Sequence, residues 1–115
     1  MKVRLTRRAE RDLLAIMAWS RREFGRAAQL RYEALLNIAL RDLAADPRRP
    51  GARKAEGAAE GVWLYHLRHA RLRAQPVERV RQPRHVLVFR IDADQVRVLR
   101  VLHDAMDLPE HFKDI

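Results

Sequence analysis

Residues 7–45, RRAERDLLAIMAWSRREFGRAAQLRYEALLNIALRDLAA, decide the fold of this chain. In the first half, apolar or small residues recur every three or four positions, which is the spacing of one face of an amphipathic helix. Gly25 interrupts this pattern, and a second helical pattern follows until Asp46-Pro47 ends it. Two helices with so short a connection predict an antiparallel helical hairpin.

Short stretches around the hairpin have the patterns of strands. Residues 2–6 and 62–69 alternate between the two faces of a strand. The run 85–91 has an apolar centre typical of a buried strand, and a tight turn joins it to a further strand at 96–102. The sequence therefore predicts an α+β fold in the order β-α-α-β-β-β. The helical hairpin packs on one face of a small, antiparallel-rich sheet, and a short helical turn lies near the C-terminus.

Length and composition limit the class of protein. A chain of 115 residues with 48% hydrophobic residues can form one domain, residues 1–115, around its own core. The absence of cysteine excludes a disulfide framework and thiolate chemistry. No apolar run is long enough to cross a bilayer, and no apolar segment follows the basic N-terminus, so we expect no membrane association and a cytoplasmic location.

The charge balance points to an acidic partner. Lys and Arg number 24 against 15 Asp and Glu, for a net charge of +9, and all but three of the basic residues are Arg. The excess positive charge lies in residues 1–49 and 62–91, whereas residues 92–115 are net acidic. A basic body favours binding to nucleic acid or to an acidic protein.

The connection at 70–83 is long for two neighbouring strands, because a hairpin loop needs only about two to five residues. Its arginines repel one another, and Glu78 is its only acidic residue. We expect this segment to project or to be mobile, and to face an acidic target or phosphate rather than form core. The target-facing arginines are Arg71, Arg73, Arg79 and Arg81.

Several kinds of site are not expected. The five histidines lack the spacing of a zinc site, and the four glycines form no phosphate-binding loop, so no metal and no cofactor is expected. The only serine, Ser20, lies on a helical pattern without a nucleophile elbow.

Three segments resemble the ParE-type toxins of the ParE/RelE superfamily. They are LTRRAERDLLAIMAWSRREFG, RYEALLNIALRDLAADPRRPG and RQPRHVLVFR followed by VLRVLHDAMDLPEHF. The resemblance covers most of the chain apart from residues 52–61 and the long connection, and RVLHDAMDLPEHF after a strand is its most specific part. It implies a β-α-α-β-β-β fold and the toxin half of a type II toxin–antitoxin module.

The resemblance also implies partners. A ParE-type toxin forms a hetero-oligomer with a ParD-like antitoxin, often with a ribbon-helix-helix DNA-binding domain, and it blocks replication by inhibiting DNA gyrase without chemistry of its own. A RelE-type toxin instead cleaves mRNA in the ribosome. A third hypothesis is a plain nucleic-acid-binding domain that uses the basic surface. Direct binding to nucleic acid is therefore expected to be secondary to the antitoxin and to gyrase as partners.

A metal-free ribonuclease needs a base for the 2′-hydroxyl and cations that converge on one phosphate. RelE-type ribonucleases often carry a tyrosine near the C-terminus, where this chain has His111-Phe112, and phenylalanine cannot transfer a proton. The resemblance therefore favours a binding toxin with no catalytic residues, with a ribosome-dependent endoribonuclease as the alternative. That alternative would draw on Arg68, His69, Arg84, His85, Arg100 and His103.

Two further sets of residues follow from this interpretation. An antitoxin segment is expected to cover apolar surface on the helical hairpin, with cations at its rim. At the C-terminus we expect a structural lock in which Asp107 caps the last helical turn and pairs with an arginine. The antitoxin set is Leu13, Met17, Trp19, Phe24 and Leu36 with Arg21, Arg22 and Arg31, and the lock is Arg100, Asp107, Leu108 and Phe112.

Overall fold

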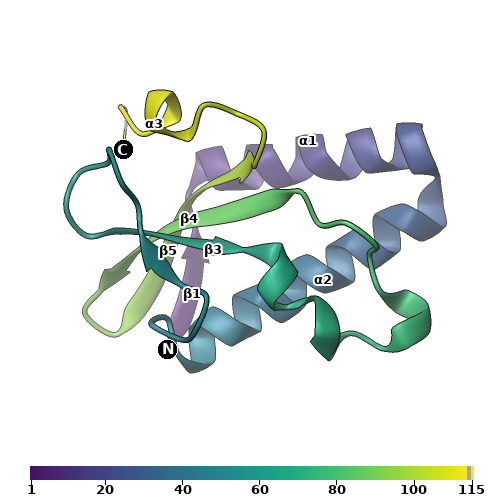
Figure 1. Ribbon diagram of the computed structural model, residues 1–115, viewed down its shortest axis with the longest axis horizontal. Helices are drawn as coiled ribbons and strands as arrows, with labels where there is room; N and C mark the ends of the chain where they lie inside the picture. Colours follow the sequence, from purple (N-terminus) through teal and green to yellow (C-terminus); the bar gives the residue numbers. More distant parts are fainter. Residues whose placement is uncertain (114) are drawn as a thin grey trace.

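A computed structural model describes residues 1–113 and 115 (Figure 1). Its elements are β1 (Lys2–Leu5), α1 (Arg7–Phe24), α2 (Arg26–Ala45), β2 (Arg53–Lys54), β3 (Val62–His66), β4 (His85–Asp92), β5 (Gln95–His103) and α3 (Leu108–His111). Three short 3-10 turns lie between β3 and β4: η1 (Leu67–His69), η2 (Arg71–Arg73) and η3 (Pro76–Glu78).

The strands form one sheet in the order β1-β5-β4-β3-β2. β1 is parallel to β5, and the other neighbours are antiparallel. Figure 1 shows α1 and α2 side by side on one face of this sheet. The predicted α+β class and the order of the main elements are confirmed. The short strand β2 was not expected, because residues 51–61 have no strand pattern.

The boundaries of the hairpin follow from local chemistry. The Thr6 side chain accepts a hydrogen bond from the backbone N–H of Ala9 at 3.1 Å and so caps α1. Gly25 joins the helices with φ +90°, a conformation that a side chain disfavours. Both helices therefore begin and end where the sequence pattern indicated.

Alternating strand residues supply two apolar clusters on opposite faces of the sheet. The larger cluster lies under the helices and includes Leu35, Tyr65 and Phe89. The smaller cluster lies on the other face, where Leu64 and Phe112 meet. The C-terminal tail thus covers part of the face that the helices leave open.

The 67–83 segment, which contains the three 3-10 turns, is held by its own hydrogen bonds and does not extend as a hairpin tip. The Arg71 Nε donates to the carbonyl of Val80 at 2.7 Å, and Arg79 donates to the carbonyls of Ala74 and Leu72, both at 3.1 Å. The expectation of an extended hairpin tip is therefore wrong, whereas the expectation that the segment stays out of the core agrees with the structure, in which none of residues 71–82 is buried. The physical reason is that these arginines donate to loop carbonyls that no strand partner would satisfy.

The C-terminal lock differs from the expectation. Asp107 occupies the N-cap of α3, but its side chain makes no capping hydrogen bond. Arg100 pairs instead with Asp12 on α1. The Asp12 carboxylate accepts from the Arg100 Nε at 2.8 Å and from the backbone N–H of Val101 at 2.9 Å. Packing holds the tail, since Phe112 is buried and Leu108 is partly buried beside it.

No helix among the described residues is long and apolar enough to cross a lipid bilayer.

Candidate functional site

A cavity of 680 Å³ opens on the sheet face that the helices leave uncovered. We call it the basic pocket. Its walls come from the loop before β2, from β3 and η1, from the residues around the start of β4, and from the C-terminal tail. The lining residues are Gly51, Ala52, Arg53, Leu64, His66, Arg68, His69, Arg84, Val86, Asp104 and Leu108.

His66 and Asp104 are joined on one side of the basic pocket. The His66 Nδ1 accepts from the backbone N–H of Arg68 at 3.0 Å, so its Nε2 carries the proton that it donates to Asp104 at 2.9 Å. The second Asp104 oxygen accepts from Arg84 Nε at 2.9 Å. Burial raises the pKa of Asp104, but the hydrogen bonds from His66 and Arg84 outweigh it and hold the pKa below its usual value. Both ring nitrogens of His66 are therefore already used.

His69 is held differently, against the loop before β2. Its ring stacks on Tyr65 with 5.5 Å between centroids and lies so close to Gly51 that a Cβ there would come within 2.7 Å of the His69 Cγ. Glycine at position 51 thus makes room for this ring. Burial, followed by the charge of Arg68, lowers the pKa of His69, which keeps the ring neutral at pH 7.

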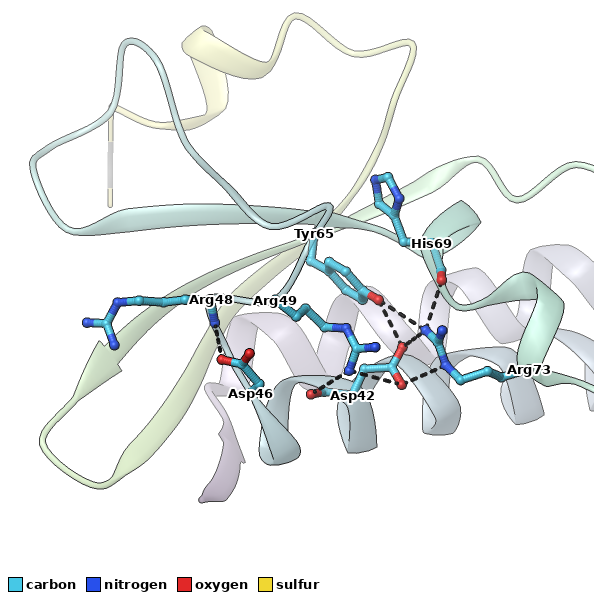
Figure 2. A network of polar contacts seen from close by, with 7 residues as sticks. All are labelled: Asp42, Asp46, Arg48, Arg49, Tyr65, His69 and Arg73. Carbon is cyan, nitrogen blue, oxygen red and sulfur yellow. Dashed lines mark hydrogen bonds and ion pairs between the residues drawn. The ribbon is translucent and has the colours of Figure 1, made fainter.

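Asp42 on α2 anchors the residues next to His69 to the helical hairpin. Its buried carboxylate accepts from the Tyr65 hydroxyl at 2.9 Å and from both Nε (3.0 Å) and a terminal nitrogen of Arg73, with Arg49 at 3.6 Å (Figure 2). Arg73 also donates to the backbone carbonyl of His69 at 2.8 Å, while the His69 ring points away from Asp42 and Arg73. The hydrogen bond with Asp42 raises the pKa of Arg73. A single carboxylate therefore ties β3, η1 and η2 to the helical hairpin.

A second polar group lies between the sheet and the hairpin. His85 is 5% exposed, and its Nδ1 is hydrogen bonded to the Tyr32 hydroxyl, whose oxygen also accepts from the backbone N–H of Arg84 at 3.1 Å. Burial and the neighbouring His103 lower the pKa of His85 to about 4. Burial raises the pKa of Tyr32 to about 12. His103 Nδ1 accepts from the backbone N–H of Ala105 at 3.0 Å. Tyr32 thus links α2 to the start of β4.

The six residues of the ribonuclease alternative do not all converge on one site. Arg68, His69 and Arg84 line the basic pocket. His85 and His103 line a separate cavity of 440 Å³ beside Trp19 on α1. Arg100 reaches Asp12, as described above.

Sequence reasoning missed three ionisable side chains of the basic pocket: Arg53, His66 and Asp104. The strand alternation places His66 on the same face as Leu64, which could have drawn attention to it. Arg53 and Asp104 could not be assigned, because they reach the pocket through an unexpected strand and through the exit loop of β5.

The proposed antitoxin residues fall on two separate surfaces. Leu13, Met17 and Leu36 line a groove of 390 Å³ between the helices, which we call the interhelical groove. Trp19, Phe24 and Arg31 line a different cavity of 680 Å³ where the hairpin meets the 67–83 segment, which we call the tip pocket. Arg21 and Arg22 are exposed on α1 and line neither cavity. The full lining of the tip pocket is Trp19, Ser20, Phe24, Ala28, Arg31, Tyr32, Val77, Arg79, Val80, Arg81, Gln82 and Arg84.

Within the described part of the chain, no three His, Asp or Glu side chains gather in a way that could hold a metal ion. The polar chemistry of the cavities is therefore that of arginine, histidine and carboxylate groups.

The fold is that of a small α+β protein with a helical hairpin on one face of its sheet, and its cavities include the basic pocket, the interhelical groove and the tip pocket. The family model described as "ParE toxin of type II toxin-antitoxin system, parDE" matches residues 3–108, and the chain belongs to this family. No curated protein matches the chain closely enough to count as a relative.

Two solved structures share the fold. One is the chromosomal ParDE toxin–antitoxin system from P. aeruginosa, with 20% identity and a TM-score of 0.66 over 90% of this chain and 95% of that one. The other is a YoeB/ParE toxin from Agrobacterium tumefaciens, with 15% identity and a TM-score of 0.53 over 90% of this chain and 98% of that one. At these identities the likeness concerns the fold alone.

Proposed function

We propose that this toxin acts in the cytoplasm by binding DNA gyrase and blocking replication, and that a ParD-like antitoxin with a ribbon-helix-helix domain holds it inactive in a hetero-oligomer. Membership of the ParE toxin family supports the antitoxin pairing. The net charge of +9 supports protein or nucleic-acid surfaces of opposite charge as targets.

The observation that carries a binding mechanism is that the histidines on the sheet are hydrogen bonded within the fold through their Nδ1 atoms. A general base needs an accessible lone pair within reach of the substrate proton. The Nδ1 atoms of His66 and His103 accept hydrogen bonds from backbone N–H groups, and the Nδ1 of buried His85 is hydrogen bonded to the Tyr32 hydroxyl. The tyrosines are equally unsuited, because burial raises the pKa of both Tyr32 and Tyr65 to about 12. Proton transfer at pH 7 therefore has few candidates on this sheet.

A supercoiling assay tests the proposal. Purified toxin is added to gyrase, ATP and relaxed plasmid, and we expect supercoiling to fall or cleaved plasmid to accumulate. Adding the antitoxin encoded with this toxin is the matched control and should restore supercoiling. Full supercoiling at a large molar excess of toxin over gyrase would contradict the proposal.

One observation favours the endoribonuclease alternative. The basic pocket brings His69 together with Arg53, Arg68 and Arg84, and the lowered pKa of His69 keeps its ring neutral. In the described part of the chain, the His69 ring is engaged by stacking on Tyr65 rather than by a hydrogen bond. A translation extract separates the two functions, since site-specific mRNA cleavage that disappears in His69→Ala would support this alternative and leave gyrase untouched.

A further inference from the structure

The tip pocket combines an exposed apolar floor with a rigid frame. Phe24 is 66% exposed and meets the Trp19 ring edge-on, with 5.5 Å between centroids, and Val77 on the opposite wall is 90% exposed. Val80 lies beside them and is packed against the main core. Apolar side chains this exposed and gathered around one cavity are typical of an interaction site.

The wall formed by the 67–83 segment is fixed before any partner arrives. Arg71 donates to the Val80 carbonyl, Arg79 donates to two carbonyls within the segment, and Arg73 is held by Asp42. A preformed wall lowers the entropy lost on binding.

The rim of the tip pocket is cationic. Arg31 and Arg81 line it from α2 and from the 67–83 segment, together with Arg79 and Arg84, and no carboxylate belongs to the lining. Among the described residues, neither Arg31 nor Arg81 has an acidic partner. These charges complement a partner that is itself acidic.

The interhelical groove differs in its charge. Glu10 and Glu33 line it, and its apolar residues include Leu14, which is 72% exposed. An acidic segment would meet repulsion there. Both surfaces are therefore apolar, but the tip pocket has a cationic rim and the interhelical groove has an acidic one.

We infer that the tip pocket, and not the interhelical groove, binds an acidic amphipathic segment of the antitoxin. The apolar face of that segment fills the space between Phe24 and Val77, and its carboxylates meet Arg31 and Arg81. A cavity of 680 Å³ is large enough for one or two large anchoring side chains. This inference rests on the antitoxin pairing of the proposed function, but not on the identity of the target.

The test uses two matched substitutions on exposed apolar residues. Val77→Glu places a carboxylate in the tip pocket, and Leu14→Glu places one in the interhelical groove. Both sites are largely exposed, so both variants are expected to keep the wild-type melting temperature. The probe is the purified full-length antitoxin encoded with this toxin, and the measurement is its Kd by calorimetry.

We expect Val77→Glu to weaken antitoxin binding by about tenfold or more, and Leu14→Glu to change it by less than about threefold. We also expect Arg31→Gln with Arg81→Gln to weaken binding and to flatten its dependence on salt. A larger loss from Leu14→Glu than from Val77→Glu, or equal affinity in all variants, would overturn the inference. The supercoiling assay on free wild-type toxin is run in parallel, so a wrong target is recognised separately from a wrong antitoxin surface.

Discussion

Replacing Asp42 with alanine tests the network that ties the 67–83 segment to the hairpin. The substitution leaves the hydroxyl of fully buried Tyr65 without its acceptor, which costs about 1–3 kcal/mol. It also removes the partner of Arg73, whose side chain is 44% exposed and can turn to water, so this loss is about 1 kcal/mol, well below the cost of breaking a fully buried pair. We therefore expect the free energy of unfolding to fall by about 2–4 kcal/mol, or roughly 8–16 °C in Tm for a domain of this size.

Asp46→Ala is the matched control, because Asp46 is exposed and its side chain accepts from the backbone N–H of Arg48 at 3.0 Å (Figure 2). We expect it to cost about 0.5 kcal/mol or less. Urea denaturation measures both variants, and hydrogen exchange follows the backbone amides of the 67–83 segment. Faster exchange in that segment for Asp42→Ala alone would support the network. Equal destabilisation by the two variants, or unchanged exchange, would refute it.

The remaining predictions concern Asp12, His85 and His103. Asp12→Ala removes the acceptor for Arg100 and for a strand N–H, so we expect it to lower the free energy of unfolding by about 1–3 kcal/mol, whereas Asp107→Ala should change it by less than about 0.5 kcal/mol in the same urea titration. His85 has a pKa of about 4 in the folded state, below its unfolded value, so the unfolded chain binds an extra proton as the pH falls from about 6.5 to 4. The free energy of unfolding should fall by up to about 3 kcal/mol across that window, and His85→Gln should flatten this slope. His103→Gln should keep toxicity in cells, and a folded, antitoxin-binding but harmless variant would contradict the binding mechanism.

The helices and most strands could be predicted because their signals are local. Thr6, Gly25 and Pro47 mark the ends of helices through caps and backbone preferences that act within a few residues. The apolar run that became β4 has only one stable environment, between two layers of core.

The interior of the 67–83 segment could not be predicted, because its structure depends on a partner distant in sequence. Asp42 and Arg73 are separated by 31 residues, and nothing in the local pattern around either residue indicates the pairing. The same applies to Asp12 and Arg100, separated by 88 residues. In a chain with 21 arginines, charge alone favoured repulsion and a projecting loop, whereas in the structure Arg71 and Arg79 donate to carbonyls of the segment and Arg73 donates to the buried Asp42.

The separation of the apolar hairpin residues into two surfaces could also be seen only in the structure. Met17 and Trp19 are close in sequence and lie on one predicted helix, yet they line different cavities. The 67–83 segment creates the second cavity by packing beside the end of the hairpin. Sequence patterns identified the apolar residues but not the two surfaces.

The most direct test of the central claim is gyrase supercoiling measured against toxin concentration, with mRNA cleavage measured in a translation extract from the same preparation. A toxin that acts by binding should inhibit supercoiling in proportion to its occupancy of gyrase, lose that effect at one equivalent of antitoxin, and leave mRNA intact. Unimpaired supercoiling together with site-specific mRNA cleavage would contradict the account.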